Sequence, residues 1–204
     1  MNTKATDWID LTPDGDLSKW VTGPPAEFRV EGDTFVFHGP DVRAEVGGMS
    51  WDDYVLRTDV LVRRDAEDAY FQIELAAVGS SVYCQILPQC LNLAYYSHQK
   101  EDTAVISSTP LTIEDARWYD FQMRAESGRI TAFLDGTEVS AADSPNGTKG
   151  MPGFIIKKIR NAEPKIRNVR IMFVAPTRQQ LQELELDART NWRNYKKAQG
   201  IAQP

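Results

Sequence analysis

Residues 118–139 show the clearest pattern of apolar and polar positions in the chain. Apolar residues occupy every second position in two runs, at 119–125 and 130–134. This is the period of a strand with one buried face. Glu126-Ser127-Gly128 separates the runs and Asp135-Gly136 follows the second, and both are hairpin signals because glycine adopts the positive φ angles of tight turns. The segment therefore predicts three antiparallel strands joined by two short turns.

The same alternation recurs along most of the chain. Segments at 54–63, 69–78 and 82–87 each carry apolar residues on one side and polar residues on the other, with turn residues between them. Many short strands with regular turn signals favour an all-β protein, a two-sheet antiparallel sandwich or jelly roll. The predicted core consists of the apolar positions that share strand parity: Phe35, Phe37, Leu56, Val60, Phe71, Ile73, Leu75, Phe121, Met123, Ile130, Leu134, Ile171 and Phe173.

The pattern changes at the C-terminal end. Thr177 and Gln180 have the spacing of a capping box directly after Pro176, and Gly200 supplies a stop. We expect one amphipathic α-helix between them, so that the chain consists of a β-sandwich at 1–175 and a C-terminal helix at 176–200. The apolar stripe of this helix either packs on the chain's own sandwich or forms a self-association surface. It contains Leu181, Leu184, Trp192 and Tyr195.

Charge and length exclude several classes of protein. The 204 residues suit a single domain, and the net charge of −6 argues against nucleic-acid binding, which requires clustered Lys and Arg. The longest apolar runs are strand-sized, so we expect no membrane span. The first residues lack the apolar region of a signal peptide. A cytoplasmic protein and a secreted one whose signal has been removed would look alike here.

The sequence predicts no cofactor. Cys84 alternates in phase with Val82 and Ile86, which favours a buried apolar thiol, although a bridge to Cys90 across a short hairpin is an alternative. The histidines and cysteines do not have the spacing of a zinc site. Several loop aspartates could hold Ca²⁺, but their spacing matches no known motif. They are Asp14, Asp16, Asp41, Asp52 and Asp53.

Four stretches carry a family resemblance, at 8–20, 28–33, 118–139 and 166–171. In this order they resemble the concanavalin A-like jelly rolls and, within them, the 3-keto-disaccharide hydrolase domain (DUF1080). The third stretch is also similar to laminin-G-like domains. The resemblance implies a jelly roll at 8–174 that acts on small glycosides. Residues 68–87 depart from the family pattern, in the segment where its sugar site would lie.

Polar and aromatic residues with outward parity form the candidate ligand site. Aromatic rings stack on the apolar face of a sugar ring, while amide, carboxylate and guanidinium groups match its hydroxyls. The alternative is an ordinary solvated face on which opposite charges pair across strands. Tyrosine and glutamine on adjoining strands favour the site over the solvated face. The predicted ligand-binding residues are Arg57, Tyr70, Gln72, Tyr83, Gln85 and Trp118.

Cleavage of a glycoside would require two positioned acid and base groups. Asp59 and Glu74 are the predicted pair, because both have outward parity. His38 and His98 are the only histidines, and we expect loop or strand-end positions for them. Three hypotheses follow. The first is a saccharide-recognising sandwich without assured catalysis. The second is a 3-keto-glycoside hydrolase or lyase, and the third is an assembly subunit that contacts its partners through the C-terminal helix.

Overall fold

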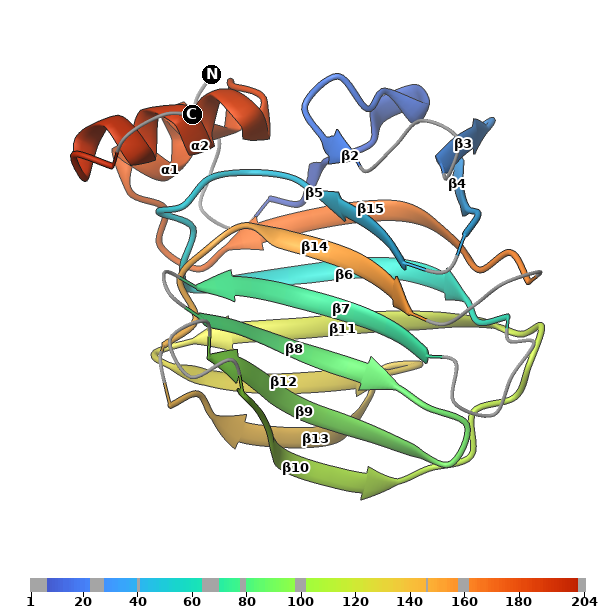
Figure 1. Cartoon of the computed structure of the whole chain (residues 1–204). Helices are drawn as coiled ribbons and strands as arrows, with labels where there is room; N and C mark the ends of the chain where they lie inside the picture. Colours follow the sequence, from blue (N-terminus) through green and yellow to red (C-terminus); the bar gives the residue numbers. More distant parts are fainter. Residues whose placement is uncertain are drawn as a thin grey trace.

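The computed structural model describes residues 7–22, 28–39, 41–63, 70–77, 80–97, 102–145, 147–157 and 162–201. Its strands form two antiparallel sheets packed face to face, which confirms the predicted all-β sandwich of the jelly-roll kind (Figure 1). The eight-stranded sheet has the order β13-β12-β11-β6-β15-β4-β3, with β1 also paired to β15. Its strands are β1 (Ile9–Asp10), β3 (Phe28–Glu31), β4 (Thr34–Phe37), β6 (Tyr54–Leu61), β11 (Trp118–Glu126), β12 (Arg129–Leu134), β13 (Thr137–Asp143) and β15 (Lys165–Phe173).

The seven-stranded sheet lies in front of the first in Figure 1 and has the order β10-β9-β8-β7-β14-β5-β2. In it β14 lies between β7 and β5, so residues from distant parts of the chain become neighbours. Its strands are β2 (Val21–Thr22), β5 (Asp41–Glu45), β7 (Tyr70–Ala77), β8 (Ser80–Ile86), β9 (Cys90–Ser97), β10 (Asp102–Pro110) and β14 (Pro152–Lys157). A short 3₁₀ turn, η1 (Pro13–Gly15), follows β1.

The two predicted hairpin turns are present. Ser127 and Gly128 have φ angles of 52° and 79°, and Asp135 and Gly136 have φ angles of 50° and 77°. Two consecutive positive φ angles are the conformation of the type I′ turn, whose twist matches that of the strands it connects. The turns join β11 to β12 and β12 to β13, in the register that places Phe121 opposite Leu134.

The core fills the space between the sheets. Phe121, Met123 and Ile171 are fully buried there, and they belong to one continuous cluster with the inward residues of the other sheet. Every residue of the predicted core belongs to this cluster except Leu75, whose side chain lies outside the described residues. Cys84 is buried in the same cluster, and burial raises the pKa of its thiol. Both Cys84 and Cys90 are free thiols, so the alternative of a bridge between them is wrong.

The C-terminal segment forms two helices, α1 (Arg178–Leu184) and α2 (Ala188–Ala198), so the prediction of one uninterrupted helix is wrong. The predicted capping box is present, because the backbone N–H of Gln180 donates to Thr177 Oγ1 and the Gln180 side chain accepts from the Thr177 N–H. The helix ends at Leu184 because Asp187 starts a new one. Its carboxylate accepts from the Thr190 N–H at 2.9 Å, as an N-cap does.

Both helices pack on the sandwich at the end where residues 46–53 connect the two sheets. Gln180 donates to the carbonyls of Ser50 and Asp52, and Asn191 donates to that of Gly47. Leu184 packs against the main core. This part of the apolar stripe is therefore used within the chain. No helix among the described residues is long and apolar enough to cross a membrane.

The aromatic end of the stripe is less buried. Tyr195 packs on a small second cluster of Met49, Met151 and Ala188. Trp192 remains 38% exposed and stacks on the Tyr195 ring with 5.6 Å between centroids.

Candidate functional site

The predicted site residues lie on two different surfaces. Arg57, Asp59 and Trp118 point outward from the eight-stranded sheet. Gln72, Glu74, Tyr83 and Gln85 alternate with core residues of the seven-stranded sheet and point outward from its opposite side. Tyr70 belongs to β7 and pairs with Lys157, but its side chain lies outside the described residues.

This division corrects the predicted catalytic pair. Asp59 and Glu74 face away from each other on the two outsides of the sandwich, with the core between them. They cannot flank one glycosidic bond, so the pairing of Asp59 with Glu74 as acid and base is wrong. The error arose because parity along a strand shows which residues share a face of that strand, but not which strands share a sheet.

The outer face of the eight-stranded sheet is a solvated surface of paired charges. Arg57 donates two hydrogen bonds to Asp120, at 2.8 and 2.7 Å, from the neighbouring strand. Arg167 donates to Asp59 at 3.2 Å and lies over the Trp118 ring at 4.3 Å. The Arg57 side chain is 44% exposed. These contacts match the alternative in which outward charges stabilise the sheet across strands.

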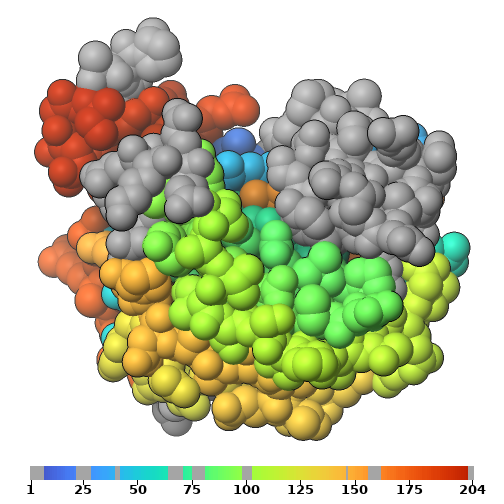
Figure 2. Space-filling model, turned by 60° about the horizontal axis from the view of Figure 1, so that its bottom comes forward, coloured from blue at the N-terminus to red at the C-terminus, as the bar shows by residue number. Residues whose placement is uncertain are grey.

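The outer face of the seven-stranded sheet is different, because three of its polar side chains are buried. Glu74 is 3% exposed, Tyr83 4% and Gln72 7%. Figure 2 looks onto the lower end of this side of the molecule, where β8, β9 and β10 (green to yellow-green) come forward. Buried polar groups cost free energy unless they find partners, so an outward sheet face usually carries exposed ones.

Two rows of side chains cross this face. One row is Gln72, Gln85 and Asn92, three amides on the neighbouring strands β7, β8 and β9. The next row contains Glu74 and Tyr83, which are directly paired residues of β7 and β8. Asn92 Oδ1 is buried without a hydrogen-bond partner. A buried acceptor without a donor bears the cost of desolvation without the gain of a hydrogen bond.

A cluster of three charged side chains occupies one side of the same face. Arg43 Nη2 lies 2.7 Å from Glu45 Oε1 and 3.0 Å from Glu74 Oε2, so one guanidinium nitrogen binds both carboxylates. Gly153 of β14 lies between Glu45 and Glu74 in the sheet and pairs with both. A Cβ atom at Gly153 would come within 3.0 Å of Glu45 Cγ, so the Glu45 side chain leans over this glycine.

The pKa of Glu45 is shifted by its surroundings. Burial raises the pKa of Glu45, the charge of Glu74 raises it further, and Arg43 acts in the opposite direction. Glu45 therefore holds its proton to a higher pH than an exposed glutamate does. Two carboxylates beside one cation can bind hydroxyl groups, and a carboxyl group with a raised pKa can also exchange protons with a ligand.

Sequence reasoning missed Arg43, Glu45 and Asn92. A signal for the first two is present, because residues 41–45 alternate between polar side chains and the buried Val42 and Ala44. The segment is short and lies between Gly-Pro and Gly-Gly punctuation, which hides the strand. Nothing in the sequence indicates that β14 places Glu45 beside Glu74.

The described residues contain no group of three or more His, Cys, Asp or Glu side chains that could hold a metal ion. Three of the five loop aspartates considered for Ca²⁺ accept hydrogen bonds from protein groups. Asp16 accepts from Ser18, Asp52 from Thr148, and Asp53 from the Ser127 N–H. The Asp41 side chain and His98 lie outside the described residues. His38 follows β4 directly, as expected for a strand end, and lies 3.3 Å from Glu163.

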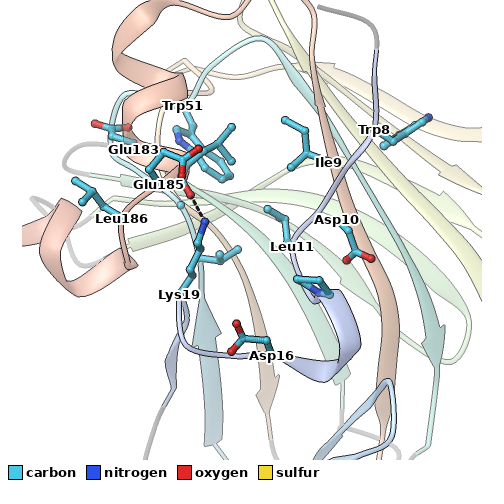
Figure 3. A pocket seen from close by; sticks show the side chains of 14 residues that line it. Trp8, Ile9, Asp10, Leu11, Asp16, Lys19, Trp51, Glu183, Glu185 and Leu186 are labelled. Atoms are coloured by element: carbon cyan, nitrogen blue, oxygen red, sulfur yellow. Dashed lines mark hydrogen bonds between the residues drawn. The ribbon is translucent and has the colours of Figure 1, made fainter. Parts of the chain in front are cut away.

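Two cavities lie at the helical end of the sandwich, and neither contains a residue predicted to bind saccharide. The first, of about 330 Å³, lies between the N-terminal segment and the end of α1 (Figure 3). There Lys19 Nζ donates to the Leu184 carbonyl at 2.6 Å, while Glu183 binds Ser50. Its polar groups thus join the N-terminal segment to the helices. The second is a cavity of about 630 Å³ between α1 and α2, and five of the residues that line it carry amide side chains.

Comparisons with known proteins identify the fold. No protein-family model and no curated protein matches the chain. Among solved structures, it is similar to the carbohydrate-binding module CBM66 from Bacillus subtilis, with a TM-score of 0.61 and 14% identity over 76% of this chain and 95% of that one. The Crh5 transglycosylase gives a TM-score of 0.62 and 10% identity over 85% and 86% of the two chains.

A putative glycosyl hydrolase from Parabacteroides distasonis gives a TM-score of 0.58 and 11% identity over 82% of this chain and 94% of that one. At such low identities the similarity shows the fold alone. The chain therefore has the jelly-roll sandwich fold that these carbohydrate-binding and carbohydrate-processing proteins share.

Proposed function

We propose that this protein recognises a saccharide on the outer face of its seven-stranded sheet. The observation that carries the proposal is the burial of Gln72, Glu74 and Tyr83 on a face that points away from the core. Polar residues are seldom placed in this way for stability alone, because desolvation opposes it. Such groups are common where a site is organised in advance for a ligand.

The chemistry of the face suits sugar hydroxyls. Gln72, Gln85 and Asn92 offer both amide donors and carbonyl acceptors in one row, and Asn92 Oδ1 still lacks a donor. Glu74 supplies a carboxylate and Tyr83 a ring beside it. The similar structures support the proposal, since their names include a carbohydrate-binding module, a transglycosylase and a glycosyl hydrolase.

A glycan array followed by calorimetry tests the proposal. We expect Gln85→Ala and Tyr83→Ala to weaken saccharide binding at least about tenfold, because each removes a contact from the site. The matched control is Gln122→Ala, which removes a half-buried glutamine from the outer face of the other sheet. Binding that survives Gln85→Ala but is lost in Gln122→Ala would place the site on the eight-stranded sheet and contradict the proposal. An array without any bound glycan would contradict the proposal.

A second candidate function is cleavage of a small glycoside, as in the 3-keto-disaccharide hydrolase family that the sequence resembles. The observation in its favour is the carboxylate pair Glu45 and Glu74, which replaces the predicted pair of Asp59 and Glu74. Two oxygens bound to one nitrogen lie less than about 6 Å apart, and a spacing of about 5–5.5 Å between carboxyl groups is typical of retaining glycosidases.

Incubation with 3-keto disaccharides and chromatography of the products tests this second function. Release of monosaccharide by the wild type but not by Glu74→Gln would support catalysis. Asp59→Asn is the matched control and should retain the activity, because Asp59 lies on the other side of the sandwich. Binding of the disaccharide with complete recovery of intact sugar would leave recognition as the function.

A further inference from the structure

We infer that Arg43, Glu45 and Glu74 make the outer face of the seven-stranded sheet selective for neutral saccharides over acidic ones. The inference rests on the proposed function, because it concerns the ligand of the same site. It adds a property that the fold alone does not imply, namely the sign of charge that the ligand can carry.

The described charged side chains of this face carry no net positive charge. Among its described side chains, the charged ones are Arg43, Glu45 and Glu74, and the neighbouring groups Gln72, Tyr83, Gln85 and Asn92 are neutral. Two carboxylates and one guanidinium give a net charge of −1 when all are ionised. When Glu45 is protonated the net charge is zero. In neither state does the cluster present an uncompensated positive charge.

Arg43 is already bound to two carboxylates of the protein. An acidic sugar is held in proteins by a cation that is free to bind its carboxylate or sulfate. Arg43 already binds two carboxylates through Nη2, at 2.7 and 3.0 Å. A third anion at another guanidinium nitrogen would lie beside both carboxylates and be repelled by them. Displacing Glu74, whose side chain is only 4% exposed, would leave a buried carboxylate without its cation.

The cluster offers carboxylate acceptors to the hydroxyl groups of a neutral ligand. Carboxylate oxygens accept several hydrogen bonds, and the donors that a neutral sugar brings are its hydroxyl groups. Hydrogen bonds to an ionised acceptor are stronger than those between neutral groups. The Arg43 side chain is 45% exposed, so solvent and small ligands reach the cluster from its outer side. A neutral saccharide can thus use the carboxylates without disturbing the ion pairs.

A glycan array with matched pairs tests the inference. Each neutral oligosaccharide is printed beside the same oligosaccharide capped with sialic acid or a uronic acid. We expect the full-length protein to bind neutral members at least about tenfold more strongly than their acidic partners, because like charges repel strongly at a partly buried site. Equal or stronger binding of the acidic members would overturn the inference while leaving saccharide recognition intact. Absence of binding to every glycan would instead overturn the proposed function.

Charge-neutralising variants assign the preference to these residues. Glu74→Gln and Glu45→Gln each keep the shape of the side chain while removing a negative charge. The ratio of neutral to acidic glycan binding should therefore fall about tenfold in either variant. Glu45 is the less buried of the two, with 18% exposure against 4%, and provides the test if Glu74→Gln does not fold. The control is Glu126→Gln, on the outer face of the other sheet, which should leave the preference unchanged. A preference unaltered in both test variants would overturn the assignment.

Discussion

The two outer faces of the sandwich carry similar kinds of residue in different states. On the eight-stranded sheet the charges of Arg57 and Asp120 pair across neighbouring strands while remaining open to solvent. On the seven-stranded sheet Gln72, Glu74 and Tyr83 are almost fully buried. Both sets alternate with core residues in the same way, so strand parity does not separate them.

The difference distinguishes a surface of exposed ion pairs from the face on which we propose that a saccharide binds. Exposed pairs contribute little to stability and tolerate substitution. Buried polar groups need fixed partners, and Asn92 Oδ1 is an acceptor on this face that has none. Substitutions on the two faces, in the core and in the helices should therefore have effects of very different size.

Phe121→Ala should cause the largest loss of stability, because it removes a core side chain that faces neither solvent nor ligand. Phe121 is fully buried between the sheets, so the cavity should lower the free energy of unfolding by about 3–5 kcal/mol. The neighbouring substitution Gln122→Ala, on the outer face, should change it by less than about 0.5 kcal/mol. Denaturant titrations of both variants measure the two values. A loss below about 1 kcal/mol for Phe121→Ala would mean that the inner and outer faces are reversed.

Truncation after Pro176 removes both helices without touching either outer face. It deletes the bonds of Gln180 and Asn191 to the 46–53 segment and uncovers the apolar residues around Leu184. We expect stability to fall by roughly 2–4 kcal/mol in thermal or denaturant melts. Light scattering should give the same oligomeric state as the full chain.

The opposite result would support the prediction of self-association through Leu181, Leu184, Trp192 and Tyr195. In that case the truncated protein would keep its stability and fall to a lower mass. Trp192→Ser would then reproduce the change, because Trp192 is the exposed member of the stack with Tyr195.

Glu45→Gln should stabilise the protein at neutral pH. The folded-state pKa of Glu45 is raised above its ordinary value of 4.5 by burial and by Glu74, with Arg43 opposing. A raised carboxyl pKa means that the folded state binds the proton more tightly, so stability is lost as pH rises through that pKa. The amide avoids this loss, and we expect a melting temperature at pH 7 higher by about 2–4 °C, or roughly 1 kcal/mol.

The pH dependence is the critical part of this prediction. Below about 4.5 Glu45 is protonated in both states, so the advantage of the glutamine should disappear there. Glu126→Gln, on the solvated face, should show no gain at pH 7. A lower melting temperature for Glu45→Gln at pH 7 would show that the ion pair with Arg43 outweighs the cost of burial.

The smallest effect is expected for Arg57→Ala. This change removes an exposed pair with Asp120, so stability should fall by less than about 1 kcal/mol. The loss should shrink further in about 1 M salt, which screens exposed charges. Comparison of urea midpoints at low and high salt measures it. A larger, salt-independent loss would mean that this face is not a simple solvated surface.

Local signals accounted for much of the fold in advance. The turns at Ser127-Gly128 and Asp135-Gly136 depend on the φ angles of a few adjacent residues, and the core positions depend on a period of two along each strand. The capping box at Thr177 is equally local. The break before α2 was missed because helical spacing continues through it, while the Asp187 carboxylate caps the second helix.

The candidate site was predictable only in part. Gln72, Glu74, Tyr83 and Gln85 were grouped correctly because β7 and β8 are consecutive strands joined directly in the sheet. Arg57, Asp59 and Trp118 were grouped with them wrongly, because the next strands along the chain belong to the other sheet. Arg43 and Glu45 lie beside Glu74 because β14 pairs with both β5 and β7. The chain forms β14 more than one hundred residues after β5.

The sequence by itself determined most of the strands, where their turns lie, and which side of these strands enters the core. These properties depend on neighbours within a few positions along the chain. Only the tertiary structure decided which strands share a sheet, and therefore which outward side chains meet. Pairing between distant strands places Glu45, Glu74 and Arg43 together and leaves Asp59 on the other side. Sheet pairing is a long-range choice made by the packing of the whole core, and no local pattern along the chain encodes it.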